Sequence, residues 1–473
     1  MAAAEAAATA ASGRAAADVW RLRRALLLPP LMRSAGAIEA SRRRYEAGLE
    51  SLAAAPPLRA DPLDALGTAH FFLAYHGADD RPLLELQART LDHAFGPAAT
   101  PAEDAGRAAA APLRVGFLST HFRDHTILRL HAGLIAAMPA SRIRPVLMLV
   151  NGETDAASES LAAAVAAQGG ETLRLPRALA PAAAAVAAAR LDVLYYADIG
   201  MDPFTYLLAR HRLAPVQAVG WGHPGTTGLP TIDAFLVAEA MAGTGAEAGF
   251  SEPLLRLPHA PLLWEAEAPA ALDARAVLGI PPGAPLFACL QAPFKLHPDF
   301  DRVLAAILSG DRAARLVLLA PRYDAWRRLI EERLAKAGIA VADQVVFAAP
   351  RPRREYLALV DAADVVLDPF PFGGGHTALE ALALGKPLIT WPTAAPRGRV
   401  AAGFLAALGI ADTLADSAET YVARALRWAR DASERRALAQ RTKAALPLLA
   451  ANAAAAEAFA AALERLAAAP PRP

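Results

Sequence analysis

The most informative stretch of this sequence is Asp364-Val-Val-Leu-Asp-Pro-Phe-Pro-Phe-Gly-Gly-Gly-His-Thr-Ala-Leu-Glu-Ala-Leu-Ala-Leu-Gly-Lys-Pro-Leu-Ile-Thr-Trp-Pro392. Residues 365–367 form a short apolar, β-branched run, which is typical of a strand buried on both faces. Three glycines follow at 373–375, and glycine allows the backbone to take positive φ and to approach a ligand closely. His376 and Thr377 open a predicted helix, whose first N–H groups lack partners within the helix and can bind an anion. The stretch therefore predicts a strand, a turn and a helix at the carboxyl edge of a parallel sheet.

This turn has two interpretations. It can be a phosphate cradle, in which backbone N–H groups at the start of the helix face an anionic ligand. It can also be an ordinary connection in which glycines only allow the strand and helix to pack closely. Glu380 lies one turn into the helix, and Pro387 precedes a second predicted strand at residues 388–391. The residues of the stretch alone leave both interpretations open.

The composition excludes several classes of protein. The chain has 473 residues, which is too many for a single core, so we expect two or three domains. No uninterrupted apolar segment approaches the roughly 20 residues that cross a bilayer, and residues 1–20 lack the pattern of a secretory signal. The single cysteine, Cys289, excludes an intramolecular disulfide and a cysteine-based metal site. The net charge of +1 gives no argument for nucleic-acid binding. We expect a soluble, cytoplasmic protein without a membrane span.

The N-terminal quarter reads as helical. Residues 1–28 are an Ala- and Arg-rich leader, frayed or helical, and residues 29–112 predict a small helical region followed by a Pro/Ala linker that begins at Gly96. Within this region, apolar spacing predicts helices over 37–54, 62–74 and 81–95. Such helices resemble a remnant of helical repeats, but no clean 34-residue period supports a repeat array.

From Leu113 onward the pattern changes to alternating strands and helices, which predicts parallel sheets covered by helices. A Pro-rich passage at 251–285 separates two such halves. We therefore expect an α/β protein with two Rossmann-like domains, at 113–270 and 271–446, and a C-terminal helix and tail at 447–473. Strands are predicted at 113–119, 145–150, 171–175, 191–196, 216–221 and 234–237 in the first half, and at 286–290, 314–320, 344–347, 365–367 and 388–391 in the second.

Polar residues that follow the predicted strands are candidates for a functional site, because the carboxyl ends of parallel strands meet at one edge of a sheet. In the first half, His121 and His125 follow the first strand and are candidate bases. A turn rich in glycine and hydroxyl groups, which includes His223 and Thr226, follows another strand. In the second half Lys295 follows a strand, where it could neutralise a leaving phosphate. The alternatives are surface histidines and a tight strand-to-helix loop.

Acidic and basic residues near helix starts also have two interpretations. Asp198 and Asp202 could bind sugar hydroxyls, or Asp202 could cap the helix that starts at residue 203. Asp299 and Asp301 match the Asp-x-Asp of metal-dependent glycosyltransferases, but they stand where acidic side chains stabilise a helix dipole. The arginines at 351–354 could hold phosphate or line a solvated helix start. No other acidic pair follows a strand, so we predict no essential metal.

Several of these loops together resemble the SPINDLY and O-GlcNAc transferase group, glycosyltransferase family 41, especially its bacterial members. The resemblance covers residues 113–446. The segments that carry it are Leu113-Arg-Val-Gly-Phe-Leu-Ser119 with His125, Leu213-Ala-Pro-Val-Gln-Ala-Val-Gly-Trp-Gly-His-Pro-Gly-Thr-Thr-Gly228 with Asp233, Phe294-Lys295, Asp368-Pro-Phe-Pro-Phe-Gly-Gly-Gly-His-Thr-Ala-Leu-Glu380 and Arg399-Val-Ala-Ala402.

This resemblance implies a GT-B fold, preceded here by a small all-α region, and inverting, metal-independent transfer from UDP-GlcNAc or UDP-glucose without a cofactor. The implied acceptor is a protein Ser, Thr or Asn side chain; alternatives are a glycan, a small-molecule acceptor or a non-catalytic scaffold. Two departures stand out: Tyr356 replaces a histidine of the animal enzymes, and the long tetratricopeptide array is absent or reduced to the few helices before the linker that begins at Gly96. The implied catalytic residues are His125, near the sugar and acceptor, and Lys295, on the leaving group. The implied donor-binding residues are His223, Thr226, Gln291, Lys295, Arg353, Gly374, Gly375, His376, Thr377 and, on the ribose, Glu380.

Overall fold

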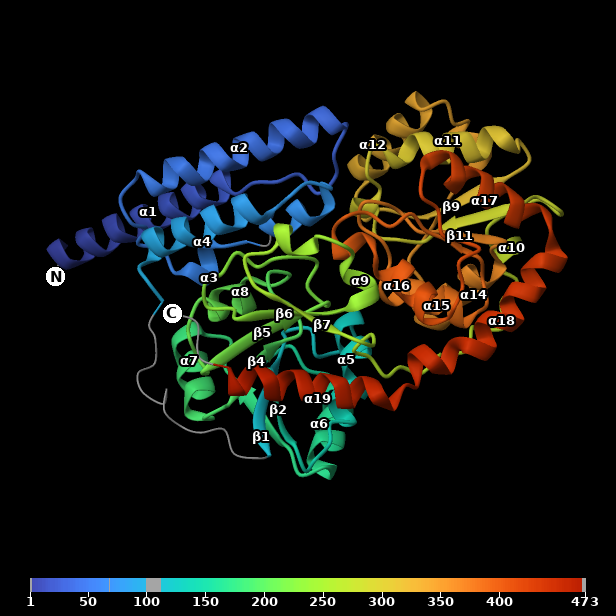
Figure 1. The fold of residues 1–473 in the computed structure, drawn as a ribbon. Helices are drawn as coiled ribbons and strands as arrows, with labels where there is room; N and C mark the ends of the chain where they lie inside the picture. Colours follow the sequence, from blue (N-terminus) through green and yellow to red (C-terminus); the bar gives the residue numbers. More distant parts are fainter. Residues whose placement is uncertain (1, 68, 99–111, 470–473) are drawn as a thin grey trace.

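The computed structural model describes residues 2–67, 69–98 and 112–469, which form an N-terminal helical region and two α/β domains (Figure 1). The predicted helices at 37–54 and 81–95 are confirmed. The single helix predicted over 62–74 is wrong: it is interrupted where Leu66 takes an extended conformation and Gly67, a poor helix former, follows. The helical region consists of α1 Ala2–Ala25, α2 Ala35–Ala53, α3 Pro62–Ala65, the 3-10 helix η1 Ala69–Tyr75 and α4 Arg81–Phe95.

Ion pairs join the helical region to both α/β domains; the pair to the second domain is buried and the pair to the first is partly exposed. The Asp80 carboxylate pairs with Arg42 of α2 and with Arg397 of the second domain, at nitrogen-to-oxygen distances of 2.6 and 3.0 Å. Arg210 of the first domain pairs with Asp92 of α4 at 2.7 Å. Since breaking a buried pair leaves an uncompensated charge, these contacts hold the helices in one position relative to the domains.

The first domain contains a seven-stranded parallel sheet in the order β3-β2-β1-β4-β5-β6-β7. All six strands predicted for this half are confirmed. The seventh, β7, falls in the Pro-rich passage that we predicted as a connection, and it pairs only as a four-residue edge strand between Pro253 and Pro258. The strands are β1 Leu113–Leu118, β2 Ile143–Val150, β3 Glu171–Leu175, β4 Val193–Tyr196, β5 Val216–Gly220, β6 Ala234–Ala238 and β7 Leu254–Leu257. The helices are α5 Thr126–Ala136, α6 Ala156–Ala167, α7 Leu179–Ala188, α8 Pro203–Ala209 and α9 Glu239–Ala242.

The second domain contains a five-stranded parallel sheet in the order β10-β9-β8-β11-β12, and all five predicted strands are confirmed. Because β11 lies between β8 and β12, the loops that follow these three strands leave from the same edge of the sheet. The strands are β8 Leu286–Cys289, β9 Arg315–Leu319, β10 Val345–Ala348, β11 Val365–Leu367 and β12 Leu388–Ile389. The helices are α10 Ala274–Val277, α11 Phe300–Gly310, α12 Asp324–Lys336, α13 Val341–Gln344, α14 Arg353–Ala362, α15 His376–Ala383, α16 Val400–Ala407 and α17 Ala418–Arg430, with η3 Pro293–Lys295 after β8.

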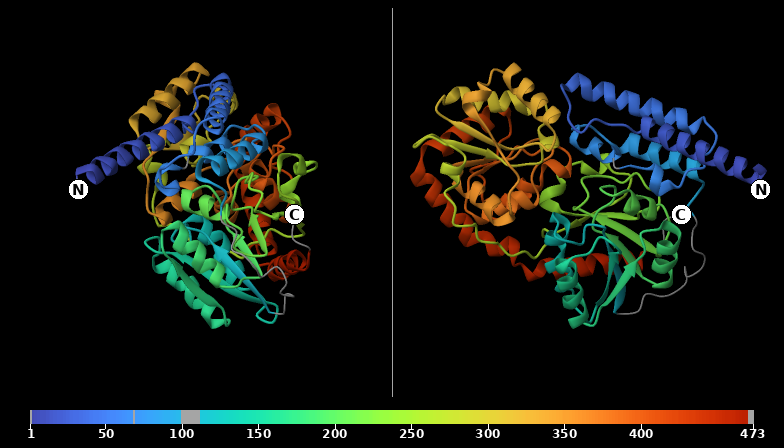
Figure 2. Two further views of the ribbon diagram at one scale, coloured as in Figure 1. Left: turned by 90° about the vertical axis from the view of Figure 1, so that its left-hand side faces the viewer. Right: turned by 180° about the vertical axis from the view of Figure 1, so that it is seen from behind.

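The last two helices, α18 Ala432–Ala450 and α19 Ala453–Ala468, run back from the second domain to the first (Figure 2). Helix α18 packs on α15, and Phe459 of α19 lies edge-on to Tyr195 of the first sheet at 5.2 Å between ring centroids. Within the described residues the helical stretch Ala432–Ala468 is, by length and composition alone, able to cross a membrane, although 44% of its most apolar window is buried against the protein. The architecture is the expected one: two Rossmann-like domains of a GT-B fold and a helical N-terminal region.

Candidate active site

A cleft of about 420 Å³ lies between the two domains, within the range typical of small-molecule sites. The loops after β1 and β5 form its wall on the first domain. The loop after β8, the glycine turn and the start of α15 form the opposite wall. The predicted site residues that line the cleft are His125, His223, Gln291, Lys295, Gly375, His376 and Thr377. The structure places Thr226, Arg353, Gly374 and Glu380 behind these walls.

The glycine turn is shaped by packing. The Gly374 N–H donates to the Asp368 carboxylate at 2.6 Å, and the Gly373 N–H donates to the Arg397 carbonyl at 3.1 Å. A Cβ on Gly374 would lie 2.5 Å from the Thr377 hydroxyl, so a side chain does not fit there. The first two glycines therefore use their amides internally, and the free donors that face the cleft are those that begin α15. The packing interpretation explains the turn, and the anion interpretation applies to the helix start behind it.

Lys295 is held above the turn by three groups. Its Nζ donates to the Gly373 carbonyl at 2.7 Å and to Gln291 Oε1 at 3.2 Å, and lies 4.6 Å from the centroid of the Phe372 ring. Gln291 in turn donates to the Thr377 hydroxyl at 2.6 Å. Burial lowers the pKa of the Lys295 ammonium to about 8, and the nearby negative charge of Asp368 acts in the opposite direction. A partly buried cation thus lies beside the N-terminus of α15.

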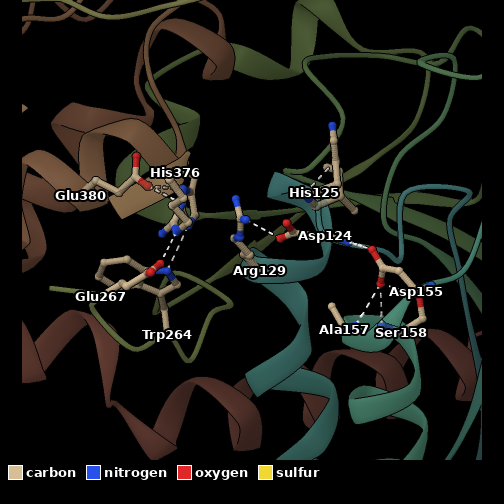
Figure 3. Close-up of polar contacts among 12 residues, drawn as sticks. Asp124, His125, Arg129, Asp155, Ala157, Ser158, Trp264, Glu267, His376 and Glu380 are labelled. Carbon is tan, nitrogen blue, oxygen red and sulfur yellow. Dashed lines mark hydrogen bonds and ion pairs between the residues drawn. The ribbon is translucent and has the colours of Figure 1, made fainter. Parts of the chain in front are cut away.

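A buried polar network backs the start of α15 (Figure 3). The Trp264 indole donates to His376 Nε2 at 3.1 Å, so His376 carries its proton on Nδ1, which lies 3.2 Å from Glu380 Oε1. Arg353 bridges Glu380 at 2.5 Å and Glu267 at 2.6 Å. Glu380 is only 3% exposed. Arg353 and His376 both contact the same oxygen of Glu380, Oε1, and the ribose contact of Glu380 stays a prediction.

On the opposite wall His125 begins α5 as its N-cap (Figure 3). Its Nδ1 accepts the Ile127 N–H at 3.2 Å, and its ring stacks on His121 at 4.4 Å. Burial, with the positive charge of neighbouring groups, lowers the pKa of His125 to about 4. Because Nδ1 accepts, the neutral ring carries its proton on Nε2. His125 can therefore donate a hydrogen bond to a ligand at neutral pH.

The loop after β5 is held by a carboxylate that the sequence did not indicate. The Thr226 hydroxyl donates to Glu252 at 2.6 Å, and the Thr227 N–H donates to the same carboxylate at 2.8 Å. Thr226 therefore shapes the loop and does not reach the cleft. His223 does reach it, and burial lowers its pKa to about 3, so its ring is neutral.

The acidic residues with two interpretations act structurally. Asp202 accepts a backbone N–H at the start of α8 at 2.8 Å, which is the predicted cap. Asp198 is fully buried and accepts from the Ser119 hydroxyl. Asp301 pairs with Arg333 through both oxygens, at 2.9 and 2.7 Å. Across the described part of the chain, no three His, Cys, Asp or Glu side chains gather as they would around a metal ion.

The sequence also missed an aromatic wall contributed by η1. Tyr75 stacks on Phe372 at 4.8 Å and packs on Phe294 at 4.7 Å between ring centroids, and both partners adjoin Lys295. Phe71 lines the cleft beside it. The only signal was a local concentration of aromatic residues at 71–75, at the end of the helix predicted over 62–74.

The comparisons with known proteins agree with this geometry. Residues 264–448 match the sequence model of glycosyl transferase family 41. The chain is 30% identical over 247 residues to the UDP-glucose:protein N-beta-glucosyltransferase of Actinobacillus pleuropneumoniae, covering 51% of this chain and 39% of the relative. It is 28% identical over 223 residues to the SPINDLY protein of Solanum lycopersicum, named a probable UDP-N-acetylglucosamine--peptide N-acetylglucosaminyltransferase, covering 46% of this chain and 24% of the relative. These matches confirm the resemblance, although the chain spans less than half the length of either relative.

The fold is shared with a solved bacterial structure. A lysine-to-methionine mutant of the Thermobaculum terrenum O-GlcNAc transferase superposes with a TM-score of 0.71 at 22% identity. The likeness covers 92% of this chain and 85% of that one. It therefore extends beyond the family match to the first domain and confirms the overall fold.

Proposed function

We propose that this protein is a family 41 glycosyltransferase that moves a sugar from a UDP-sugar to a protein side chain, without a metal ion or other cofactor. The observation that carries the proposal is the position of Lys295. It is a partly buried cation beside the N-terminus of α15, in the cleft between two Rossmann-like domains and within the segment that matches the family. A diphosphate has the charge and size that such a position favours.

In this proposal, Lys295 and the start of α15 promote the reaction by stabilising the leaving group. As the bond between the sugar and the diphosphate breaks, negative charge develops on the leaving phosphate oxygen. Lys295 and the first N–H groups of α15 would stabilise that charge, and preorganised donors are most effective in a buried site. The positive end of the helix dipole acts in the same direction. Direct attack by the acceptor opposite this leaving group inverts the anomeric carbon.

His125 fits the role of a hydrogen-bond donor better than that of a base. Its Nδ1 is occupied as the N-cap of α5, and its Nε2 already carries the proton in the neutral ring. Such a group can orient the sugar or the acceptor but has no free lone pair towards the cleft. We therefore assign His125 to positioning of the reacting groups.

The substrates follow from the named relatives. One is named for UDP-glucose and protein N-glucosylation and the other for transfer of N-acetylglucosamine to peptides. We therefore propose glucose or N-acetylglucosamine as the donor sugar and Asn, Ser or Thr of a protein as acceptor. Transfer to a glycan or a small molecule is the alternative. The cytoplasmic location remains a prediction.

Nucleotide binding and mass spectrometry test this proposal. UDP at 100 times its dissociation constant is expected to stabilise the protein by about 2.7 kcal/mol, visible as a raised melting temperature. UDP-glucose and UDP-GlcNAc are then incubated with the protein and a host lysate, and intact mass reports a hexose or an N-acetylhexosamine on the acceptor. If saturating UDP does not raise the melting temperature of the protein, every UDP-sugar transferase hypothesis is refuted. Stabilisation without transfer or hydrolysis would indicate a non-catalytic scaffold.

A further inference from the structure

A buried carboxylate lies directly beneath the glycine turn. Asp368 follows β11 and is 2% exposed. One oxygen accepts the Gly374 N–H at 2.6 Å, and the other accepts the Thr390 hydroxyl, just after β12, at 2.7 Å. A Cβ on Gly373 would lie 2.7 Å from the second oxygen, so the carboxylate packs against the Cα of that glycine. Both Asp368 oxygens are thus engaged by the turn and the neighbouring strand end.

The carbonyl of the same glycine, Gly373, accepts a hydrogen bond from Lys295. Lys295 Nζ donates to the Gly373 oxygen at 2.7 Å, so the ammonium and the Asp368 carboxylate both lie against one residue. Burial raises the pKa of Asp368 to about 6, while the Gly374 N–H, the Thr390 hydroxyl and Lys295 act in the opposite direction. At neutral pH the carboxylate is therefore largely ionised.

Two further titratable groups that lie against Asp368 are neutral. Cys289 of β8 is buried, and burial raises the pKa of its thiol far above neutrality. Tyr421 of α17 donates its hydroxyl to the Asp368 carbonyl at 3.0 Å, and burial likewise raises the pKa of that phenol. Asp368 is thus the negative charge that acts on Lys295.

We propose that Asp368 is a positioning residue for the nucleotide site: it folds the glycine turn by taking the Gly374 N–H and is the counter-charge that keeps Lys295 protonated. The first role turns one amide inward, so that the amides at the start of α15 are left for a ligand. The second role holds a cation in place before any diphosphate arrives. The identity of the ligand rests on the proposed function, but the pairing of the two residues does not.

The substitution Asp368→Asn removes the negative charge of the side chain but keeps its shape, so it tests the charge alone. Asparagine is nearly isosteric, its oxygen can accept the Gly374 N–H, and its NH₂ can donate to Thr390. The chain has four lysines, at positions 295, 336, 386 and 443, so NMR of lysine labelled at the ε position resolves each one. A Lys295→Met sample assigns the signal of interest. These titrations need no nucleotide.

The expected result is a lower midpoint for Lys295. Removal of a close opposite charge lowers the pKa of an ammonium by about 1 unit or more. In the wild-type protein the Lys295 signal is also expected to show a second inflection near pH 6, where Asp368 takes up a proton. An unchanged midpoint in Asp368→Asn, or a wild-type titration without the second inflection, would overturn the pairing. The wild-type measurement decides the matter even if the variant does not fold.

Asp364→Asn is the matched control at the other end of β11. Asp364 pairs with Arg275 at 2.6 Å and with Arg435 at 2.9 Å, on the side of the strand away from Lys295. This variant is expected to melt at a lower temperature while the Lys295 midpoint stays in place. An equal shift in both variants would mean that the effect is a general loss of structure and would count against Asp368 as counter-charge.

UDP affinity measured at pH 6.5 and 8 tests the consequence for the site. With Lys295 midpoints of about 8 and about 7, the fraction of protonated Lys295 falls about twofold in the wild type and about eightfold in Asp368→Asn between these pH values. The loss of UDP affinity is expected to follow these ratios. Equal losses in both proteins would overturn the coupling to the ligand. Absence of UDP binding by the wild type would instead refute the proposed function, and the nucleotide-free titration would still test the pair.

Discussion

Replacing Lys295 with methionine tests the leaving-group role most directly. Methionine keeps much of the volume and removes the charge, together with the two hydrogen bonds to Gly373 and Gln291. Preorganised donors at a developing negative charge contribute about 2–4 kcal/mol to transition-state stabilisation. We therefore expect turnover to fall by about 30- to 900-fold.

The same substitution is expected to leave the fold intact. Burial lowers the pKa of Lys295 from 10.5 to about 8, so the folded state holds this proton less tightly than the unfolded state does. Below pH 8 that difference destabilises the fold by about 3 kcal/mol, and the penalty fades as the pH rises from 8 to 10.5. Methionine removes the penalty but leaves two acceptors without a donor, which costs about 1–3 kcal/mol each. The effects nearly cancel, so the melting temperature should stay within a few degrees.

The assay is the initial rate of UDP release at saturating donor, with the melting temperature measured on the same samples. Lys336→Met is the control, because Lys336 lies exposed near the end of α12, outside the cleft. It is expected to match the wild type in both measurements. A folded Lys295→Met protein with turnover within about fivefold of the wild type would refute the leaving-group assignment.

Three further predictions concern the walls of the cleft. His125→Asn keeps a helix cap, so this variant should retain the melting temperature but lose turnover. His125→Ala should lose turnover and, in addition, about 1 kcal/mol of stability. Full turnover in the Asn variant would contradict a donor role for Nε2. Glu380→Gln disrupts an ion pair with Arg353 in which the glutamate carboxylate is buried. It should therefore lower the melting temperature more than Glu267→Gln, because the Glu267 carboxylate is 39% exposed. Equal shifts in calorimetry would argue against the network. Tyr75→Ala removes two ring contacts worth about 0.5–1.5 kcal/mol each and should raise the donor KM several-fold; an unchanged KM would show that η1 does not shape the donor site.

Most of the fold could be predicted because its elements carry local signals. Each strand of the second sheet is a short apolar run that ends at a turn, and all five were found to within a residue or two. The helix predicted over 62–74 failed because apolar spacing does not show where a chain such as Leu66-Gly67 leaves the helical conformation. The edge strand β7 was missed because its flanking prolines indicate a connection, and its pairing with β6 is visible only in three dimensions.

The site was predicted in position but not in its internal bonding. Lys295, His376 and Thr377 meet because the loops after β8 and β11 leave one edge of the sheet, which the alternation of elements implies. Arg353 and Glu380 were predicted to contact the donor, and their pairing with each other was not foreseen; Arg353 also pairs with Glu267, and these contacts span 27 and 86 residues of chain. Sequence shows which charges are present and not which of them neutralise each other.

The N-terminal helical region contributes to the cleft between the two domains. Gly77 approaches Pro371 so closely that a Cβ there would lie 2.6 Å from the ring, and Asp80 is ion-paired to Arg397 three residues later in the same region. Between these contacts and the cleft lies Tyr75, stacked on the aromatic rings that adjoin Lys295. Because Phe71 and Tyr75 line the cleft, the helical region forms part of its wall. Because a charge acts more strongly where protein shields it from water, we expect the aromatic rings around Tyr75 to strengthen the field of Lys295 in the cleft.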